Sequence, residues 1–274
     1  MAVSYLIFSG IILILAGRGK RPQLTLATTT SVQDSGLLDA LIPPFETENK
    51  CRVKVIAVGT GQAIRLAEEG NVDIILVHAP AQEEMFVEEG YGVRRYSIMY
   101  NYFAIVGPEE DAAGIKGERK GVKALKKIAV SESTFISRGD DSGTHRKERE
   151  LWSAAGVEPS GGWYTEAGTG MVGTLRIANE RRAYTLTDRG TYLAHRKELD
   201  LTILVEEDEN LYNPYSIIPV SKEKYPHINY QLVMKFVEFI TGVKGQNIIR
   251  AYGEKEYGVP LFFPLAISGL SEDK

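Results

Sequence analysis

The chain has 274 residues, of which 43% are hydrophobic and 25% are charged, and its formal net charge is −4 at pH 7. This composition excludes a disordered or collagen-like chain, and the length favours two lobes that each bury a core. The acidic balance argues against nucleic-acid binding, and the single Cys51 excludes an intrachain disulfide and a cysteine metal cluster.

The chain opens on an almost wholly apolar segment, Val3–Ala16. It is shorter than the ~20 residues of a spanning helix, so residues 1–22 are interpreted as an export signal peptide. Three basic residues follow the segment and none precedes it, which opposes the usual charge order, so an uncleaved N-terminal membrane anchor stays open. A buried N-terminal strand or helix is less favoured because nothing polar alternates within the segment. We expect an exported protein, periplasmic or on the outer face of the cytoplasmic membrane.

From Gln23 onward, strand patterns alternate with helix patterns. The strands are expected at Leu24–Ala27, Arg52–Val58 and Val72–His78, and the helices at Gly36–Glu48, Gln62–Glu69 and Glu83–Glu89. This order is typical of an α/β fold in which helices cover a sheet and ligands bind beyond the carboxyl ends of the strands.

Two extended segments, Tyr100–Val106 and Tyr212–Val220, are interpreted as paired hinge strands that cross between lobes. Lobe I is then expected to hold residues 23–105 and 212–274, and lobe II residues 106–211. A Gly-Thr-Gly sequence opens a predicted helix at 59–61 and again at 168–170, which favours two similar lobes.

Two hydroxyl-rich loops follow apolar strands and precede helices: Thr28–Ser31 and Ser137–Thr144. Free backbone N–H groups and the dipole at a helix start favour an anion, hydroxyls add donors, and the Arg138 guanidinium can hold two oxygens. The two loops together predict a clamp for a small oxyanion.

Simpler interpretations of these loops stay open. Ser31 and Ser142 are also ordinary helix caps, and Thr28–Thr30 can equally be the end of a strand. Arg138 can pair with Asp140 or Asp141. Ordinary capping does not require Arg138 between turn-forming residues, so the second loop is the more specific signal.

Enzyme interpretations have weaker support. Gly168-x-Gly170-x-x-Gly173 matches a dinucleotide fingerprint, but the segment before it is short and polar, so a nicotinamide-dependent enzyme is the least favoured alternative. His145 lies near Ser142 without a nucleophile elbow, and we expect it to be a surface or loop histidine.

Taken together, these motifs resemble the tungstate-binding proteins of ABC importers from about Gln23 to Ala251. The residues that carry the resemblance are Thr28-Thr29-Thr30-Ser31-x-x-x-Ser35-Gly36-Leu37-Leu38, Val58-Gly59-Thr60-Gly61-Gln62-Ala63, Ser137-Arg138-Gly139-Asp140-Asp141-Ser142-Gly143-Thr144-His145, Tyr184-Thr185-Leu186-Thr187-Asp188-Arg189-Gly190 and Asn213-Pro214-Tyr215.

The resemblance implies a two-lobed type II periplasmic-binding-protein fold, with mixed sheets flanked by helices and two crossing hinge strands. It implies a solute-binding protein that is not an enzyme, has no cofactor or directly bound metal, captures tungstate or molybdate, and delivers it to a membrane permease with a cytoplasmic ATPase. The oxyanion contacts that it implies are Thr29, Arg138 and Thr144 first, then Thr30, Ser31, Ser142 and Gly143, and finally Thr169, Gly170 and Met171.

The second loop also resembles that of phosphate receptors through Arg138-x-Asp140-x-Ser142-Gly143-Thr144. Monohydrogen phosphate carries a proton that needs an acceptor, whereas tungstate needs donors only. A carboxylate that faces the ligand would favour phosphate. If Asp140 and Asp141 cap the helix or pair with Arg138, tungstate is favoured. The sequence does not separate tungstate from molybdate.

Overall fold

The computed structural model describes residues 21–266. The predicted export segment, residues 1–22, therefore falls almost wholly outside the described residues. Among residues 21–266, no helix has both the length and the apolar character that crossing a membrane requires.

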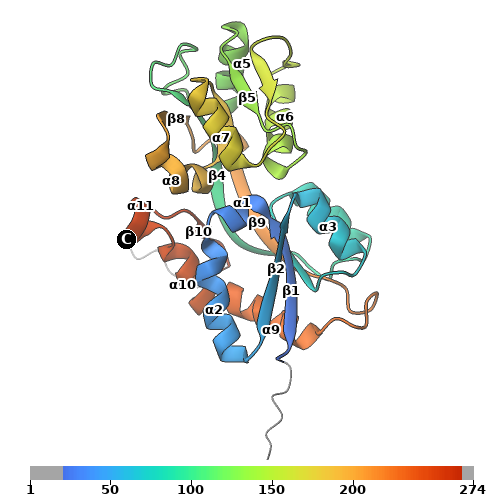
Figure 1. Ribbon diagram of the computed structural model, residues 1–274. Coiled ribbons are helices and arrows are strands. Elements are labelled where there is room, and N and C mark those ends of the chain that lie inside the picture. The colour runs from blue at the N-terminus through green and yellow to red at the C-terminus, as the bar shows by residue number, and fades with distance from the viewer. Residues whose placement is uncertain (1–20, 267–274) are drawn as a thin grey trace, which may run out of the picture.

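Two lobes are joined by two long neighbouring strands, β4 (Tyr96–Pro108) and β9 (Tyr212–Pro219) (Figure 1). The strands pair antiparallel over Tyr96–Tyr102, and from Phe103 onward β4 pairs instead with strands of the other lobe. The predicted pair of hinge strands is thus confirmed. The crossing lies close to the predicted lobe boundary at 105/106, and that division of the chain stays a prediction.

Lobe I, the lower half of Figure 1, holds both chain ends of the described part. Besides β9 and the first half of β4, it consists of β1 (Gln23–Thr29), α1 (Thr30–Asp34), α2 (Leu37–Asn49), β2 (Arg52–Val58), α3 (Thr60–Glu68), β3 (Ile74–Val77), α4 (Pro80–Glu88), α9 (Tyr230–Thr241), α10 (Val243–Ala251), α11 (Glu254–Tyr257) and β10 (Phe263–Pro264).

The sheet of lobe I is mixed, with the strand order β10-β4-β9-β3-β1-β2. Strand β1 is parallel to both β2 and β3, so their carboxyl ends meet at the edge that faces lobe II, whereas β9 runs antiparallel to β3. Thr28 and Thr29 were expected in a loop, with a strand end as the alternative, and the structure shows the strand end. Both residues are the last two of β1, because they continue its ladder opposite Ala57 and Val58.

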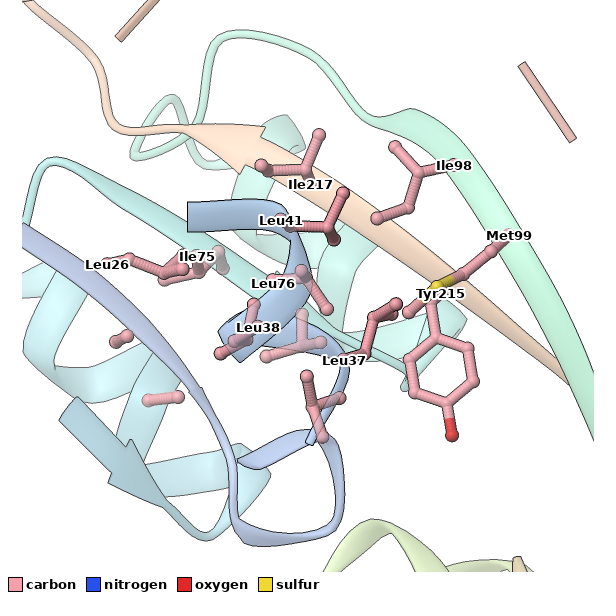
Figure 2. Close-up of a cluster of buried hydrophobic side chains, with 14 of the residues drawn as sticks. Leu26, Leu37, Leu38, Leu41, Ile75, Leu76, Ile98, Met99, Tyr215 and Ile217 are labelled. Carbon is pink, nitrogen blue, oxygen red and sulfur yellow. The ribbon is translucent and has the colours of Figure 1, made fainter. Parts of the chain in front are cut away.

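The core of lobe I forms where α2 packs on the sheet (Figure 2). Leu37, Leu38 and Leu41 of α2 lie among apolar side chains from four strands. The labelled strand residues in the figure are Leu26, Ile75, Leu76, Ile98, Met99, Tyr215 and Ile217, all at most 1% exposed. Burying each such side chain contributes roughly 1.5–3 kcal/mol, so this core holds the strand ends, and the turns that follow them, in fixed positions.

Lobe II consists of the second half of β4 with α5 (Gly121–Val130), β5 (Phe135–Ser137), α6 (Gly143–Ala154), β6 (Tyr164–Glu166), α7 (Met171–Glu180), β7 (Thr185–Asp188), α8 (Arg189–His195) and β8 (Leu201–Val205), plus 3₁₀ turns at Arg196–Glu198 and Glu209–Leu211. Strands β7 and β8 flank β4, and β5 joins them through a bridge between Phe135 and Tyr184. Lobe II has an aromatic core of its own. It includes Phe135 and Trp152, whose rings meet edge to face.

Candidate functional site

The starts of several helices face one another between the lobes. A hollow of about 310 Å³ is lined from lobe I by Thr30, Gly59, Gly61, Gln62 and Arg65, and from lobe II by Arg138, Asp140, Asp141 and Gly170. These residues begin α1 and α3 on one side and precede α6 and α7 on the other. Because helix starts carry unbonded N–H groups, the hollow is electropositive at its walls.

The turn from β1 into α1 supplies hydroxyls from lobe I. Thr29 caps α1, since its Oγ1 accepts the N–H of Val32 at 3.4 Å, and it lies 3.0 Å from the Ser31 hydroxyl. One hydroxyl of this pair donates to the other, and the second keeps its hydrogen for a further acceptor. Thr29 and Ser31 are buried, while Thr30 reaches the hollow.

Arg138 provides the charge of lobe II. It follows β5, is only 3% exposed, and donates from one terminal nitrogen to Asp140. Asp140 is held from the other side as well, because its second oxygen accepts the backbone N–H of Ser142 at 3.2 Å. This carboxylate therefore orients the guanidinium fork toward the hollow. Gly139 allows the tight turn, since its φ is +61° and a Cβ there would lie 2.6 Å from the Cβ of Glu166.

Asp141 is the second carboxylate of this loop. It lies on the rim of the hollow, where Arg146 donates to it at 2.7 and 3.1 Å. Asp140 pairs with Arg138, as the tungstate interpretation expects, whereas Asp141 pairs with Arg146, which that interpretation did not include. Both carboxylates are thus already occupied by cations or N–H groups of the protein.

The start of α6 combines a cap with free donors. Ser142 caps the helix by accepting the N–H of His145 at 3.3 Å, and its own hydroxyl hydrogen remains available. Capping and anion binding are therefore compatible at this residue. His145, expected at the surface, is in fact buried at 8% exposure because its Nδ1 accepts the N–H of Asp141 and so closes the loop.

Three buried donors near the hollow have no partner among residues 21–266. They are the Arg138 Nε–H and the hydroxyls of Thr144 and Thr60. An unsatisfied buried donor costs about 1–3 kcal/mol. One of these donors belongs to a residue that lines the hollow and two lie at the starts of α3 and α6, which indicates that an acceptor from outside the protein completes the site. The required partner is a compact group whose oxygens accept hydrogen bonds from donors of both lobes.

Thr60 was not among the predicted contacts. It is the first residue of α3, 1% exposed, and follows the cap residue Gly59. The available signal was the first Gly-Thr-Gly sequence, which was interpreted as a sign of two similar lobes and as part of the family resemblance, but not as a ligand contact.

His78 is a second residue that the sequence did not single out. Its Nδ1 lies 2.8 Å from the Asn213 Oδ1, and the Asn213 amide nitrogen donates to Asn101 and Tyr215, so Nδ1 must be the donor. Burial lowers the pKa of His78 to about 4, which keeps the ring neutral with Nε2 as an acceptor. A Cβ on Gly143 would lie only 2.9 Å from this ring and 3.2 Å from the Thr60 hydroxyl, so α6 of lobe II docks directly on lobe I here.

The predicted contacts at the start of α7 differ from one another. Gly170 lines the hollow as the cap residue of α7. The Met171 side chain is buried in the core, so only its backbone can face a ligand. The Thr169 side chain lies over Gly173 of its own helix, where it would be 2.8 Å from a Cβ. The structure therefore brings Gly170 to the hollow but not the Thr169 hydroxyl.

The structure around the dinucleotide fingerprint does not favour a nucleotide site. The strand before the fingerprint, β6, has three residues, none of them buried, and pairs with β5 in a two-stranded sheet. Within residues 21–266, no group of three or more His, Cys, Asp or Glu side chains is placed to hold a metal ion. The hollow is lined by hydrogen-bond donors and by two carboxylates that are each paired with an arginine.

Comparison with known proteins gives the family. The PBP superfamily domain matches residues 16–244. The tungstate-binding protein TupA of Peptoclostridium acidaminophilum is 49% identical over 245 residues, which are 89% of this chain and 86% of that protein. The chain belongs to the TupA family of the PBP superfamily.

Solved structures agree with this placement in the TupA family. The tungstate ABC transporter structure from Geobacter sulfurreducens is 53% identical, covers 84% of this chain and 98% of its own, and superposes with a TM-score of 0.78. The tungstate-binding protein TupA from Desulfovibrio alaskensis G20 is 42% identical, covers 90% and 100%, and has a TM-score of 0.79. The predicted family and two-lobed fold class are confirmed, and membership of a family of binding proteins agrees with the prediction that the chain is not an enzyme.

Proposed function

We propose that this protein captures tungstate between its lobes and delivers it to an ABC importer. The observation that carries the proposal is the set of three buried, unpartnered donors at the helix starts, Arg138 Nε, Thr60 Oγ1 and Thr144 Oγ1, in a chain of the TupA family. Tungstate is a proton-free tetrahedral dianion, so every one of its oxygens accepts and none donates. A site built from donors matches that requirement.

The contacts expected in this proposal come from both lobes. Lobe I supplies Thr29, Thr30, Ser31 and Thr60, and lobe II supplies Arg138, Ser142, Gly143, Thr144 and the backbone at Gly170 and Met171. Closing the lobes removes water, which strengthens each of these hydrogen bonds. Several charge-assisted bonds in such a site support a nanomolar Kd, about −12 kcal/mol.

The carboxylates support tungstate over phosphate. A phosphate receptor needs an acceptor for the proton of monohydrogen phosphate. Asp140 and Asp141 both line the hollow, but Arg138 pairs with the first and Arg146 with the second, which weakens both carboxylates as acceptors. Molybdate has nearly the same size and charge as tungstate, so we expect it to bind at the same place.

The wider setting follows from the same proposal. An ABC importer implies a membrane permease with a cytoplasmic ATPase as partners, and a location outside the cytoplasm, in the periplasm or on the outer face of the membrane. We expect the N-terminal segment 1–22 to provide export or anchoring.

Calorimetric titration with tungstate, molybdate, phosphate and sulfate tests the proposal. We expect tungstate and molybdate to bind and phosphate and sulfate to bind far more weakly. Arg138→Glu should abolish tungstate binding, since it replaces the central cation by a repelling carboxylate. Arg176→Glu, at an exposed position on α7, is the matched control and should leave the Kd unchanged. Tight phosphate binding, or an unchanged Kd in Arg138→Glu, would contradict the proposal.

A further inference from the structure

A buried carboxylate lies on α6, the helix that follows and includes the end of the oxyanion loop, residues 137–144. Glu148, in the second turn of α6, is 1% exposed. Its Oε1 accepts from the Tyr164 hydroxyl at 2.8 Å and from the Trp152 Nε1–H at 3.2 Å. A carboxylate is rarely buried without a cation, and the groups that surround this one are neutral donors.

The same carboxylate reaches the strand that carries Arg138. β6, which carries Tyr164, pairs with β5 from Phe135 to Ser137, and the Ser137 side chain and the backbone N–H of Arg138 favour the charged form of Glu148, which opposes the rise of its pKa. The Ser137 oxygen accepts the N–H of Gly139 at 3.2 Å, which leaves its hydrogen to point to the carboxylate. Glu148 therefore links the end of β5 to the body of α6, the two elements that the loop 137–144 connects.

We infer that Glu148 is the positioning residue of the oxyanion loop: its carboxylate fixes the Arg138 fork relative to the donors at the start of α6. It does not touch the ligand itself. This inference rests on the proposed function, since it concerns the affinity of the same site.

The bridge requires a carboxylate rather than an amide. Tyr164 and Trp152 donate to one oxygen of Glu148, and Ser137 and the Arg138 backbone N–H favour its charged form. A glutamine offers one acceptor oxygen and must turn its own NH₂ group toward one pair of these donors. Glu148→Gln should therefore loosen either the β5 side or the β6 side of the bridge, and weaken tungstate binding about tenfold or more.

The protonation of Glu148 gives a readout that a purely structural residue would not show. Burial raises its pKa to about 7, and the titratable group that faces it, Tyr164, has its own pKa raised by burial and by Glu148, so the phenol stays protonated. His145 on α6 is turned to the backbone of Asp141 instead. The bridge is thus fully charged only above neutral pH, and tungstate affinity should rise several-fold from pH 6 to pH 8.5.

The experiment measures the Kd for dilute sodium tungstate by calorimetry, at pH 6 and pH 8.5, in the wild type, Glu148→Gln and Glu150→Gln. Glu150 lies on the same helix but is exposed, so its variant makes the same charge change without touching the bridge. We expect Glu148→Gln to bind more weakly with no pH dependence, and Glu150→Gln to behave as the wild type.

Tyr164→Phe provides a second route if Glu148→Gln fails to fold, because it removes one donor and keeps the ring; its Kd should weaken by a smaller factor. An unchanged Kd in the folded Glu148 and Tyr164 variants, or a wild-type affinity that is flat or falls with rising pH, overturns the inference. The proposed function fails in a different way, through absence of tungstate binding by the wild type.

Discussion

At the scale of the residue, ligand binding depends on individual hydrogen-bond donors. Thr144 illustrates this, because its hydroxyl is buried and has no partner among the described residues. In the absence of ligand this hydroxyl destabilises the fold, and with a bound oxyanion it contributes a hydrogen bond. Its value to the protein therefore lies in binding.

Thr144→Val removes this hydroxyl and keeps the shape of the side chain. We expect the Kd for tungstate to weaken about tenfold, while the free energy of unfolding of the unliganded protein stays equal or rises, because no protein hydrogen bond is lost. Calorimetry and urea unfolding measure the two quantities. The control is Thr202→Val on β8, far from the hollow. A variant that loses stability but keeps its affinity would show that Thr144 bonds within the protein instead.

Residue-level prediction from sequence worked where a residue type is itself diagnostic. Arg138 beside glycines and hydroxyls is an unusual combination, and the structure places it at the hollow. Thr60 and Glu148 were missed, since a threonine at a helix start and a glutamate in a helix are ordinary in any sequence. Only the fold shows that the Thr60 hydroxyl is unpartnered and that the Glu148 side chain is surrounded by donors.

At the scale of the element, the docking of α6 on lobe I depends on a missing side chain. Gly143 lies so close to His78 and Thr60 that a Cβ would approach them to 2.9 and 3.2 Å. Contacts this short are not accommodated without movement, and the ring of His78 is held by its bond to Asn213.

Gly143→Ala should therefore hold the lobes apart while each lobe stays folded. We expect at least a tenfold weaker Kd for tungstate and a smaller compaction on adding tungstate in small-angle scattering. Gly156→Ala is not a suitable control, because Gly156 has a φ of +66°. Gly162→Ala, in open space without a positive φ, is the matched change. Normal closure and affinity in Gly143→Ala would show that this contact is not needed.

The elements themselves were largely predictable, because their apolar patterns are strong. The predicted strand at Arg52–Val58 matches β2, and the helix predicted at Gly36–Glu48 lies within one residue of α2 at each end. The change of pairing partners along β4 could not be predicted, since the sequence of a long strand does not show which other strands pair with each of its halves.

At the scale of the whole molecule, the site affects the stability of the fold. The folded-state pKa of Glu148, about 7, lies above its ordinary value, so its neutral form favours the folded state at low pH and this contribution is lost as the pH rises through 7. His78 acts in the opposite direction, since a pKa lowered to about 4 destabilises the fold as the pH falls below 6.5.

The difference between the wild type and Glu148→Gln isolates the first effect. Relative to the wild type, we expect the free energy of unfolding of Glu148→Gln to gain about 2 kcal/mol between pH 5 and pH 8.5, with His78 cancelling from the comparison. Urea unfolding without tungstate at both pH values measures it, with Glu150→Gln as the control. A difference that does not depend on pH would mean that Glu148 titrates at its ordinary value.

The central claim is that two lobes enclose a proton-free oxyanion with donors alone, and a crystal structure of the protein with tungstate tests it most directly, because the anomalous signal of tungsten locates the ion. The account predicts one tungsten atom between the lobes, with its oxygens within hydrogen-bonding distance of Arg138 Nε, Thr60 Oγ1 and Thr144 Oγ1. A tungsten atom elsewhere, or one whose oxygens face a carboxylate while these donors stay unpartnered, would contradict it.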